Sequence, residues 1–321
     1  MKRSVWMILA AVLLLCAVCA VVYIVSGCGT ARTGTVAAAE AAAPVRPAAA
    51  LPEPWLELPA AAPAADEDIR LVTHRAMMQG RLQRNYTCFY DSDTYVSYWV
   101  AYPLCRAHLS TGREEVWAYD EKVPVAEQTS VKKGYGASVP TRNYPNNFYA
   151  RGHQIPNADR NAVPGMQAQT YFSTNMTPQI QNGMNGGLWA KLEEAVRNQT
   201  PENDTLYIVT GASFRAHEGE KVRTIVNKND GKTLPVPTYY WKAVLKVRRT
   251  PEGLAEAMTI GFWVPHDDLK GRNYSEFATS VDSLEILTGF DLFVNLPDGI
   301  EEDAEGNAAW NRFCSFNSGR Q

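Results

Sequence analysis

The chain has little net charge and few histidines and cysteines for its 321 residues. Its 31 lysines and arginines stand against 34 aspartates and glutamates, which gives a formal net charge of −3. This balance excludes an overall basic field of the kind that indicates a nucleic-acid partner, although it leaves room for a local basic patch. The sequence also contains no internal repeats.

Only five histidines are present. Four of them have no second histidine at a metal-binding spacing such as HxxxH, so we expect ordinary structural or surface roles for them. These four are His74, His108, His217 and His266. The fifth, His153, lies in a different kind of sequence and is considered below.

Three of the six cysteines fall in the first 28 residues. The other three, Cys88, Cys105 and Cys314, are an odd number, so at most one disulfide forms and one thiol stays free. A strand hairpin between Cys88 and Cys105 would bring these two together and makes them the first candidate pair. Three reduced, buried cysteines are the alternative, and the sequence supports it nearly as well.

The N-terminus is not expected to belong to the fold. Residues 4–25 hold no charge and are long enough to cross a bilayer, and Lys2 and Arg3 precede them. The "VSGC" at 25–28 resembles a bacterial lipobox, in which Cys28 would be lipidated after cleavage. A lipoprotein signal and an uncleaved anchor are both open. Either would tether the folded part to a membrane, outside the cytoplasm, in the bacterial envelope.

Composition then divides the chain into three parts. Residues 1–28 form the signal or anchor segment, and the Ala- and Pro-rich residues 29–67 predict a semi-extended tether. From residue 68 to 321 the sequence is mixed and patterned. Over the whole chain, 45% of residues are hydrophobic and 20% charged, as in ordinary globular proteins. We expect one domain from 68 to 321.

The pattern in this domain predicts an α+β fold. Segments rich in aromatic and β-branched residues predict strands at 93–102, 114–120, 205–214, 238–247 and 256–265. Leu188, Leu192 and Val196 recur every four residues and predict an amphipathic helix over 186–199. A second helix is expected over 274–290, with Gly289 as its stop.

The segment "NFYARGHQIPNADR" (147–160) has no evident role in packing a core. Histidine is the commonest general base near neutral pH, because its unperturbed pKa of about 6.5 needs little adjustment. Arg151 would offer a planar guanidinium suited to phosphate. Taken alone, an Arg-Gly-His in a loop is more often structural than catalytic.

A second segment, "STNMTPQIQNGMNGGLWAKLEE" (173–194), strengthens the case. In an ideal helix Asn185 and Glu193 would lie about 12 Å apart along the axis and about 80° apart around it, so both could address one side. Their oxygens are donors of the kind that Mg²⁺ accepts. Taken separately, Asn185 would be a helix N-cap and Glu193 a solvated charge.

Together, "ARGHQ", "TNMTPQ", "NGGLW" and "AKLEE" resemble, in this order, the signature of the DNA/RNA non-specific endonuclease family. The resemblance covers roughly residues 80–295, including "YIVTGASF", "VPTYYWKAVL" and "TSVDSLEILTGFDLF". It implies the ββα-metal fold, with a mixed or antiparallel sheet core, helices and a ββα-metal finger at the active site. It also implies a metal-dependent, sugar-non-specific endonuclease of DNA and RNA.

The resemblance implies a role for each matching residue. His153 would be the general base that activates water, and Arg151 would contact the phosphate. Asn185 would be the sole protein ligand of Mg²⁺, with Mn²⁺ as an alternative, and Glu193 would orient metal-bound water. Asn175 would position His153 or the water shell of the metal.

A further catalytic arginine of the family comes from an earlier strand region, where Arg113 is the candidate. Family members are often homodimers, which no segment here tests.

Two features depart from the family pattern. Ala150 stands where the family usually has Asp, and its loss would loosen support of the loop. The spacing after "PQ" is one residue longer than is common, which makes Asn182 a rival of Asn185; the spacing to Trp189 and Glu193 favours Asn185. One alternative function is a catalytically weakened, nucleic-acid-binding envelope protein of the same fold, and another is a phosphodiesterase for small substrates.

Overall fold

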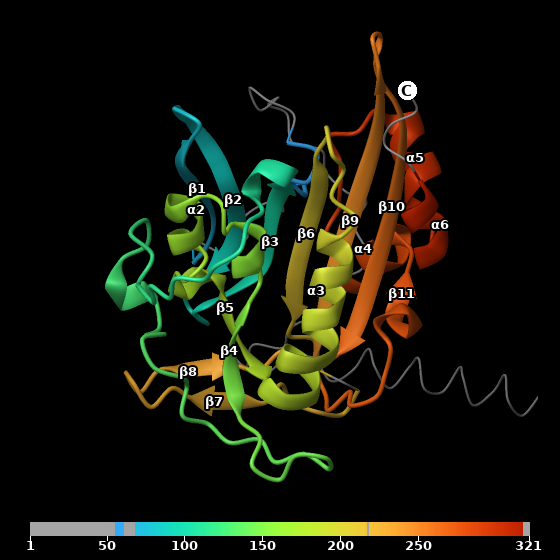
Figure 1. The fold of residues 1–321 in the computed structure, drawn as a ribbon. Helices are drawn as coiled ribbons and strands as arrows, with labels where there is room; N and C mark the ends of the chain where they lie inside the picture. The colour runs from blue at the N-terminus through green and yellow to red at the C-terminus, as the bar shows by residue number, and fades with distance from the viewer. Residues whose placement is uncertain (1–54, 61–67, 217, 317–321) are drawn as a thin grey trace, which may run out of the picture. The chain divides into compact units, whose positions relative to one another are not determined.

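The structure is a computed structural model that describes residues 55–60, 68–216 and 218–316 (Figure 1). Its central element is a seven-stranded antiparallel sheet. In spatial order the strands are β1 (Ile69–Met78), β2 (Arg81–Asp91), β3 (Val96–Leu104), β6 (Leu206–Ser213), β9 (Tyr239–Thr250), β10 (Gly253–Pro265) and β11 (Ala278–Thr279).

Two smaller antiparallel sheets and five α-helices complete the described part. The small sheets pair β4 (Tyr149–His153) with β5 (Met176–Ile180), and β7 (Thr224–Val226) with β8 (Thr233–Pro235). The helices are α2 (Pro164–Gln169), α3 (Ala190–Arg197), α4 (Val281–Thr288), α5 (Asp298–Glu305) and α6 (Trp310–Ser315). This arrangement confirms the predicted α+β class with an antiparallel sheet.

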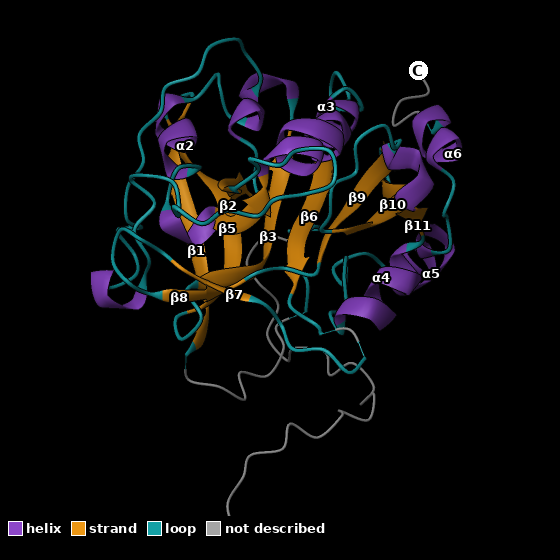
Figure 2. Cartoon of the chain, turned by 90° about the horizontal axis from the view of Figure 1, so that it is seen from below, coloured by secondary structure: helices purple, strands orange, loops and turns teal. Residues whose placement is uncertain are grey.

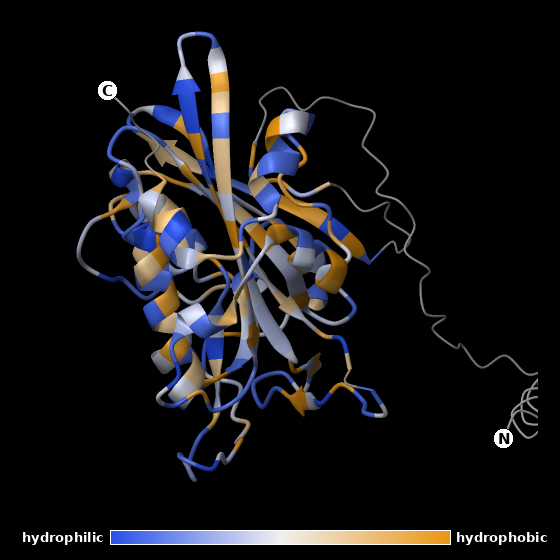
Figure 3. Cartoon of the chain, turned by 90° about the vertical axis from the view of Figure 1, so that its right-hand side faces the viewer, coloured by the Kyte–Doolittle hydropathy of each residue, from blue (hydrophilic) through white to orange (hydrophobic). Residues whose placement is uncertain are grey.

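Side-chain alternation along the strands divides the core into two layers. On β9, Tyr240 and Val244 join the core that includes α3, whereas Trp241, Ala243 and Leu245 join the core that includes α4. Figure 2 shows α3 over one face of the sheet and α4 on the other side. The covering helices carry hydrophilic and hydrophobic residues in alternation (Figure 3), as expected for helices with one buried face.

Most of the predicted strands are present. The strands expected at 93–102, 205–214, 238–247 and 256–265 correspond to β3, β6, β9 and β10. The strand expected at 114–120 is wrong, because this segment makes only one isolated bridge, between Ala118 and Phe172. Trp117 of this segment contacts the His153 region instead of a sheet neighbour, as described below. The sequence reading also missed the long β1–β2 hairpin.

The two predicted helices are shorter than expected. Leu188, Leu192 and Val196 are buried as predicted, but regular helix begins only at Ala190. Gly187 before it has a backbone (φ −130°, ψ −109°) that no helix contains. The expected helix over 274–290 is regular only in α4. That helix does end at Gly289, whose φ of 77° suits a residue without a Cβ.

The predicted Cys88–Cys105 disulfide is wrong. Cys88, Cys105 and Cys314 are all free thiols in the structure. Cys88 lies opposite Val100 in the β2–β3 pair, and Cys105 is five residues further along the chain. At about 3.3 Å per residue this places the two cysteines roughly 16 Å apart, far beyond disulfide reach.

Several predictions concern residues outside the described ranges. These are the apolar run 4–25, the lipobox ending at Cys28, most of the tether, and His217. Within residues 55–60, 68–216 and 218–316, the structure has no helix with the length and hydropathy needed to cross a membrane. The anchor and the domain boundaries therefore stay predictions.

Six residues from the tether-like region, 55–60, pack against the domain. Leu56 and Leu58 are 5% and 6% exposed and join the core on the α4 side. Between them, the carboxylate of Glu57 is buried in an ion pair with Arg84 of β2. The Arg84 guanidinium also lies 4.2 Å from the ring centroid of Trp55. This segment therefore contributes to the fold and is not a free linker.

Three histidines that were expected to be structural are held by polar contacts. His74 pairs with Asp120 (Nε2–Oδ2 2.8 Å), and Nδ1 of His108 accepts a hydrogen bond from the backbone N–H of Cys105 at 3.2 Å. Nε2 of His266 accepts from the backbone N–H of Ile180 at 2.8 Å, at the end of β5. Its Nδ1–H therefore donates to the carbonyl of Pro237, 2.7 Å away.

The buried pair at Glu57 gives a stability prediction. Glu57→Ala leaves the Arg84 guanidinium buried without its partner, so we expect a loss of about 3–5 kcal/mol in the free energy of unfolding. The matched control is Glu202→Ala, which breaks the exposed pair with Arg106 and should cost at most about 1 kcal/mol. Urea unfolding measures both, and equal losses in the two variants would contradict the prediction.

His266 gives a pH prediction. Burial lowers the pKa of His266 to about 4. In addition, Nε2 must stay unprotonated to accept the hydrogen bond from the backbone N–H of Ile180. The unfolded chain takes up a proton near pH 6.5, so the contribution of His266 is full above that pH and declines as pH falls toward 4. The stability advantage of wild type over His266→Gln should shrink by about 1–2 kcal/mol between pH 7 and 5. A constant difference in urea unfolding would refute this.

Candidate active site

The β4–β5 pair places Arg151 and His153 on one face of a small sheet. Because alternate residues point to opposite faces, Arg151 and His153 share the half-buried side, and Ala150 and Gly152 point to the buried side. The Arg-Gly-His segment is thus a strand, not the loop that the sequence suggested. A Cβ at Gly152 would lie 2.5 Å from Oε1 of Gln179, so this close approach requires glycine.

Two aromatic rings surround the His153 imidazole. Its centroid lies 5.5 Å from Trp117 and 5.3 Å from Tyr171, the latter edge to face. The same rings hold two cations. The Arg151 guanidinium stacks 3.5 Å from the Trp117 centroid, and Nε of Arg113 donates to the Tyr171 hydroxyl at 3.0 Å. The structure therefore brings Arg113, Arg151 and His153 together.

This surrounding keeps His153 neutral. Burial and then the positive charges of Arg113 and Arg151 lower its pKa to about 3, against an opposing effect of a hydrogen bond with the Arg151 backbone. Nε2 is shielded from solvent and has no hydrogen-bond partner among the described residues. A neutral imidazole with a free ring nitrogen can accept a proton.

Asn175 positions the backbone after His153. Its Oδ1 accepts from the N–H of Ile155 at 2.9 Å, and its Nδ2 donates to the carbonyls of Ile155 and Thr170 at 3.0 and 2.8 Å. These bonds occupy the amide in a fully buried position. Of the two roles suggested by the sequence, the geometry favours positioning of His153 over contact with the water shell of a metal.

The two asparagines that compete as metal ligand have different surroundings. Asn182 is tied to Asn147: its backbone N–H and its side-chain amide both donate to Oδ1 of Asn147, at 2.9 and 3.2 Å. Asn185 is half-buried and donates from Nδ2 to Oε1 of Gln181 at 2.9 Å. Its Oδ1 accepts no hydrogen bond from any residue that the structure describes, so this oxygen is available as a ligand.

Glu193 lies half-buried in a cluster of charges. Burial raises its pKa, while Lys242 of β9 and Arg197 oppose this and Asp159 adds to it. Arg197 pairs with Asp159 at 2.6 Å (Nε–Oδ1). Lys242 is 1% exposed and its Nζ lies 5.2 Å from the Trp189 ring centroid. Glu193 is therefore an embedded carboxylate and not a solvated helix charge.

The interactions thus form two groups. His153, Arg113 and Arg151 meet around Trp117 and Tyr171, and Glu193 meets Lys242, Asp159 and Arg197. No hydrogen bond between described residues joins Asn185 to either group. The ideal-helix geometry expected between Asn185 and Glu193 does not apply, because Gly186 and Gly187 between them are not helical.

The sequence reading missed the residues that support these groups. Trp117 stands in the segment expected to be a strand, and Tyr171 precedes the "STNM" motif without belonging to it. Lys242 did leave a signal, since it is a charge inside the otherwise apolar "YYWKAVL" of β9. A lone lysine at an inward-facing strand position indicates a buried partner.

Comparisons with known proteins identify the family of the chain. The family model described as DNA/RNA non-specific endonuclease matches residues 75–299. A protein named Nuclease from Nostoc sp. is 28% identical over 229 residues, covering 70% of this chain and 76% of the relative. A Nuclease of Serratia marcescens is 28% identical over 218 residues, covering 67% and 75% of the two chains.

The fold is also found among solved structures. The crystal structure of an EndoG/EndoGI complex superposes with a TM-score of 0.55 at 19% identity, covering 71% of this chain and 89% of the other. At this identity the likeness concerns the fold, and it confirms the predicted ββα-metal nuclease architecture. From the family match over residues 75–299, the chain belongs to the DNA/RNA non-specific endonuclease family and is a phosphodiester hydrolase.

Proposed function

We propose that the protein is a metal-dependent endonuclease that hydrolyses phosphodiester bonds of both DNA and RNA, with His153 as general base. The observation that carries this proposal is the neutral His153 imidazole between two guanidinium groups, with Nε2 unpaired. A site built for hydrolysis of a phosphodiester needs a proton acceptor and fixed positive charge in the same place.

The arginines have a double role in this proposal. Arg151 and Arg113 would bind the non-bridging phosphate oxygens and stabilise the charge that develops on them. A bound phosphate also offsets their positive charge, which in the free protein lowers the pKa of His153. Substrate binding would thus raise this pKa toward neutrality and strengthen His153 as a base at the moment of reaction. Asn175 keeps the imidazole in place through the backbone at Ile155.

The residues present fit a hard divalent cation. The Gln181 contact engages the amide nitrogen of Asn185 and leaves its oxygen available, and an amide oxygen is a donor that Mg²⁺ or Mn²⁺ accepts. When bound there, the cation would supply positive charge to the phosphate and the leaving oxygen. Glu193, whose pKa is raised by burial and lowered by Lys242, would orient water in this part of the site.

Lack of sequence preference follows from the kind of contacts proposed. Guanidinium groups and a cation address phosphate, which every nucleotide carries, and phosphate contacts hold no base information. The net charge of −3 does not oppose this, because two arginines, Arg113 and Arg151, lie beside His153. Two further proposals concern the location and the oligomeric state. The apolar run 4–25 and Cys28 support an extracytoplasmic location with the protein tethered to a membrane. The family resemblance supports a homodimer.

The second candidate function is a catalytically weakened protein of the same fold that binds nucleic acid, and the reason for considering it is Ala150. The side chain of Ala150 points to the buried side of β4, away from the face that carries Arg151 and His153. The substitution therefore leaves the proposed base and phosphate contacts in place, which favours the enzyme.

Cleavage of supercoiled plasmid and of a single-stranded RNA in Mg²⁺ tests the proposal. His153→Ala should lose about 10²–10⁴-fold in rate, because no other group accepts the proton. Its thermal stability should stay near that of wild type, since Nε2 makes no hydrogen bond to a described residue. Salt-dependent binding without cleavage in Mg²⁺ or Mn²⁺ would refute the enzyme and support the binding protein.

The metal ligand is tested by a matched pair of asparagine variants. Asn185→Ala should need a much higher Mg²⁺ concentration for half-maximal cleavage, because it removes the proposed ligand oxygen. Asn182→Ala should keep the Mg²⁺ dependence and lower the melting temperature, because it loses a contact with Asn147. The reverse outcome would assign the metal to Asn182.

The charge beside Glu193 is tested by pH dependence. Lys242→Met removes the main interaction that lowers the pKa of Glu193, so the acidic limb of the kcat/KM profile should shift to higher pH. Lys246→Met is the control, since Lys246 lies buried on the same face of β9 but bonds Gln199. Equal profiles for the two variants would show that Lys242 does not act on the reaction.

A further inference from the structure

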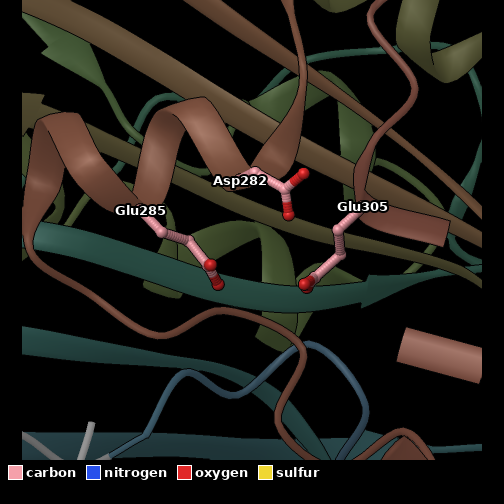
Figure 4. A group of neighbouring side chains, drawn as sticks. All are labelled: Asp282, Glu285 and Glu305. Atoms are coloured by element: carbon pink, nitrogen blue, oxygen red, sulfur yellow. The ribbon is translucent and has the colours of Figure 1, made fainter. Parts of the chain in front are cut away.

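A second group of oxygen ligands lies far from His153 in the sequence, between α4 and α5. Asp282 and Glu285 are three residues apart on α4 and so share one side of the helix. Glu305 is the last residue of α5. One carboxylate oxygen from each lies within 4.8 Å of the others. Figure 4 shows the three side chains directed toward a common space.

This space adjoins a cavity of about 420 Å³ with an acidic wall. Apart from Val294, every residue that lines it is a carboxylate: Asp282, Asp291, Asp298, Glu301, Glu302 and Glu305. No lysine, arginine or histidine of the described chain lines it. The charged residues that line the cavity are therefore all acidic, in contrast to the cluster around Glu193.

Glu305 is the member that requires a partner. It is only 7% exposed, and its Oε1 is shielded from solvent and has no hydrogen-bond partner among the described residues. Leaving a buried carboxylate oxygen unpaired is costly. Glu285 is better satisfied, because one of its oxygens accepts from the backbone N–H of Leu292 at 2.7 Å. Its other oxygen is left for a ligand.

Electrostatics in the cluster agree with a missing positive charge. Burial and, to a lesser extent, the surrounding carboxylates raise the pKa of Glu305 to about 9 and that of Glu285 to about 7. The charged groups that face them are Asp282, Asp291 and Glu301, all acidic. Either protons or a cation must neutralise this site near pH 7.

We propose that Asp282, Glu285 and Glu305 bind Ca²⁺. The donors are all carboxylate oxygens, which excludes the nitrogen and sulfur preference of zinc and suits a hard cation. Ca²⁺ holds its ligands at about 2.4 Å, so carboxylate oxygens that lie within 4.8 Å of one another can all reach one ion. The adjoining cavity leaves room for the waters that complete six to eight ligands, whereas Mg²⁺ requires a tighter octahedron.

The ion would connect α4 to the end of α5. Both helices contact β10, and the hydroxyl of Thr259 on β10 donates to the carbonyl of Ala304, beside Glu305, at 2.7 Å. Binding would therefore stabilise the C-terminal helices against the sheet. The site is separate from the metal position proposed at Asn185, so its occupancy should affect stability more than the chemistry.

The experiment measures thermal unfolding of the full chain with EDTA, with millimolar CaCl₂ and with the same concentration of MgCl₂. In the Asn185→Ala background, which removes the proposed catalytic ligand, Ca²⁺ should raise Tm by about 3–6 °C. Asp282→Asn and Glu305→Gln, each added to that background, should abolish the rise. Glu276→Gln, at an exposed carboxylate paired with Arg272, should keep it.

The outcomes separate the proposal from its alternatives. A Ca²⁺-induced rise that survives both Asp282→Asn and Glu305→Gln would place the ion elsewhere and overturn the proposal. No rise at any Ca²⁺ concentration, with stability that increases as pH falls, would show that protons alone neutralise the carboxylates. An equal rise in Mg²⁺ would overturn the choice of Ca²⁺. None of these results depends on cleavage activity.

Discussion

The requirement that a buried charge have a buried partner ties α3 to the sheet. Glu193 on α3 is opposed by Lys242 on β9 and by Arg197 one turn further, which itself pairs with Asp159. Breaking such a cluster leaves an uncompensated charge, so the helix is held in one position over β9. The segment that carries Asn185 precedes this helix directly and contacts β4 and β5. The placement of the proposed ligand relative to His153 therefore depends on the charge cluster around Glu193.

Other buried carboxylates of the domain meet the same requirement in different ways. Glu57, outside the predicted domain boundary, is paired with Arg84 of β2 and brings its neighbours Leu56 and Leu58 into the core. Among the described residues, only acidic groups act on Glu305. The contrast with Glu57 and Asp159, which have arginine partners, is the reason to look for the compensating charge of Glu305 in solution.

Local patterns allowed much of the fold and of the site to be predicted. Strand segments, the buried stripe of Leu188, Leu192 and Val196, and the stop at Gly289 follow from periodicity and backbone preference. The order of the motifs indicated the family and with it His153 and Asn185. Contacts between distant segments were not predictable in this way. Trp117 and Tyr171 contact His153 from separate loops. A local residue pattern does not indicate which loop packs against which strand.

The expected effect of Ala150 on activity depends on whether residue 150 lies in a loop or in a strand. Read as a loop, "ARGH" makes the first position a neighbour of the base, and an Asp-to-Ala change there suggests damage. Read as β4, the same position lies across from Gln179 on the buried side, and its effect on His153 must pass through the strand. Gly152 shares that side and is held there by Gln179, which no side chain could approach as closely. The close approach of Gly152 to Gln179 is thus kept, and the face that would meet the phosphate keeps its arginine and its histidine.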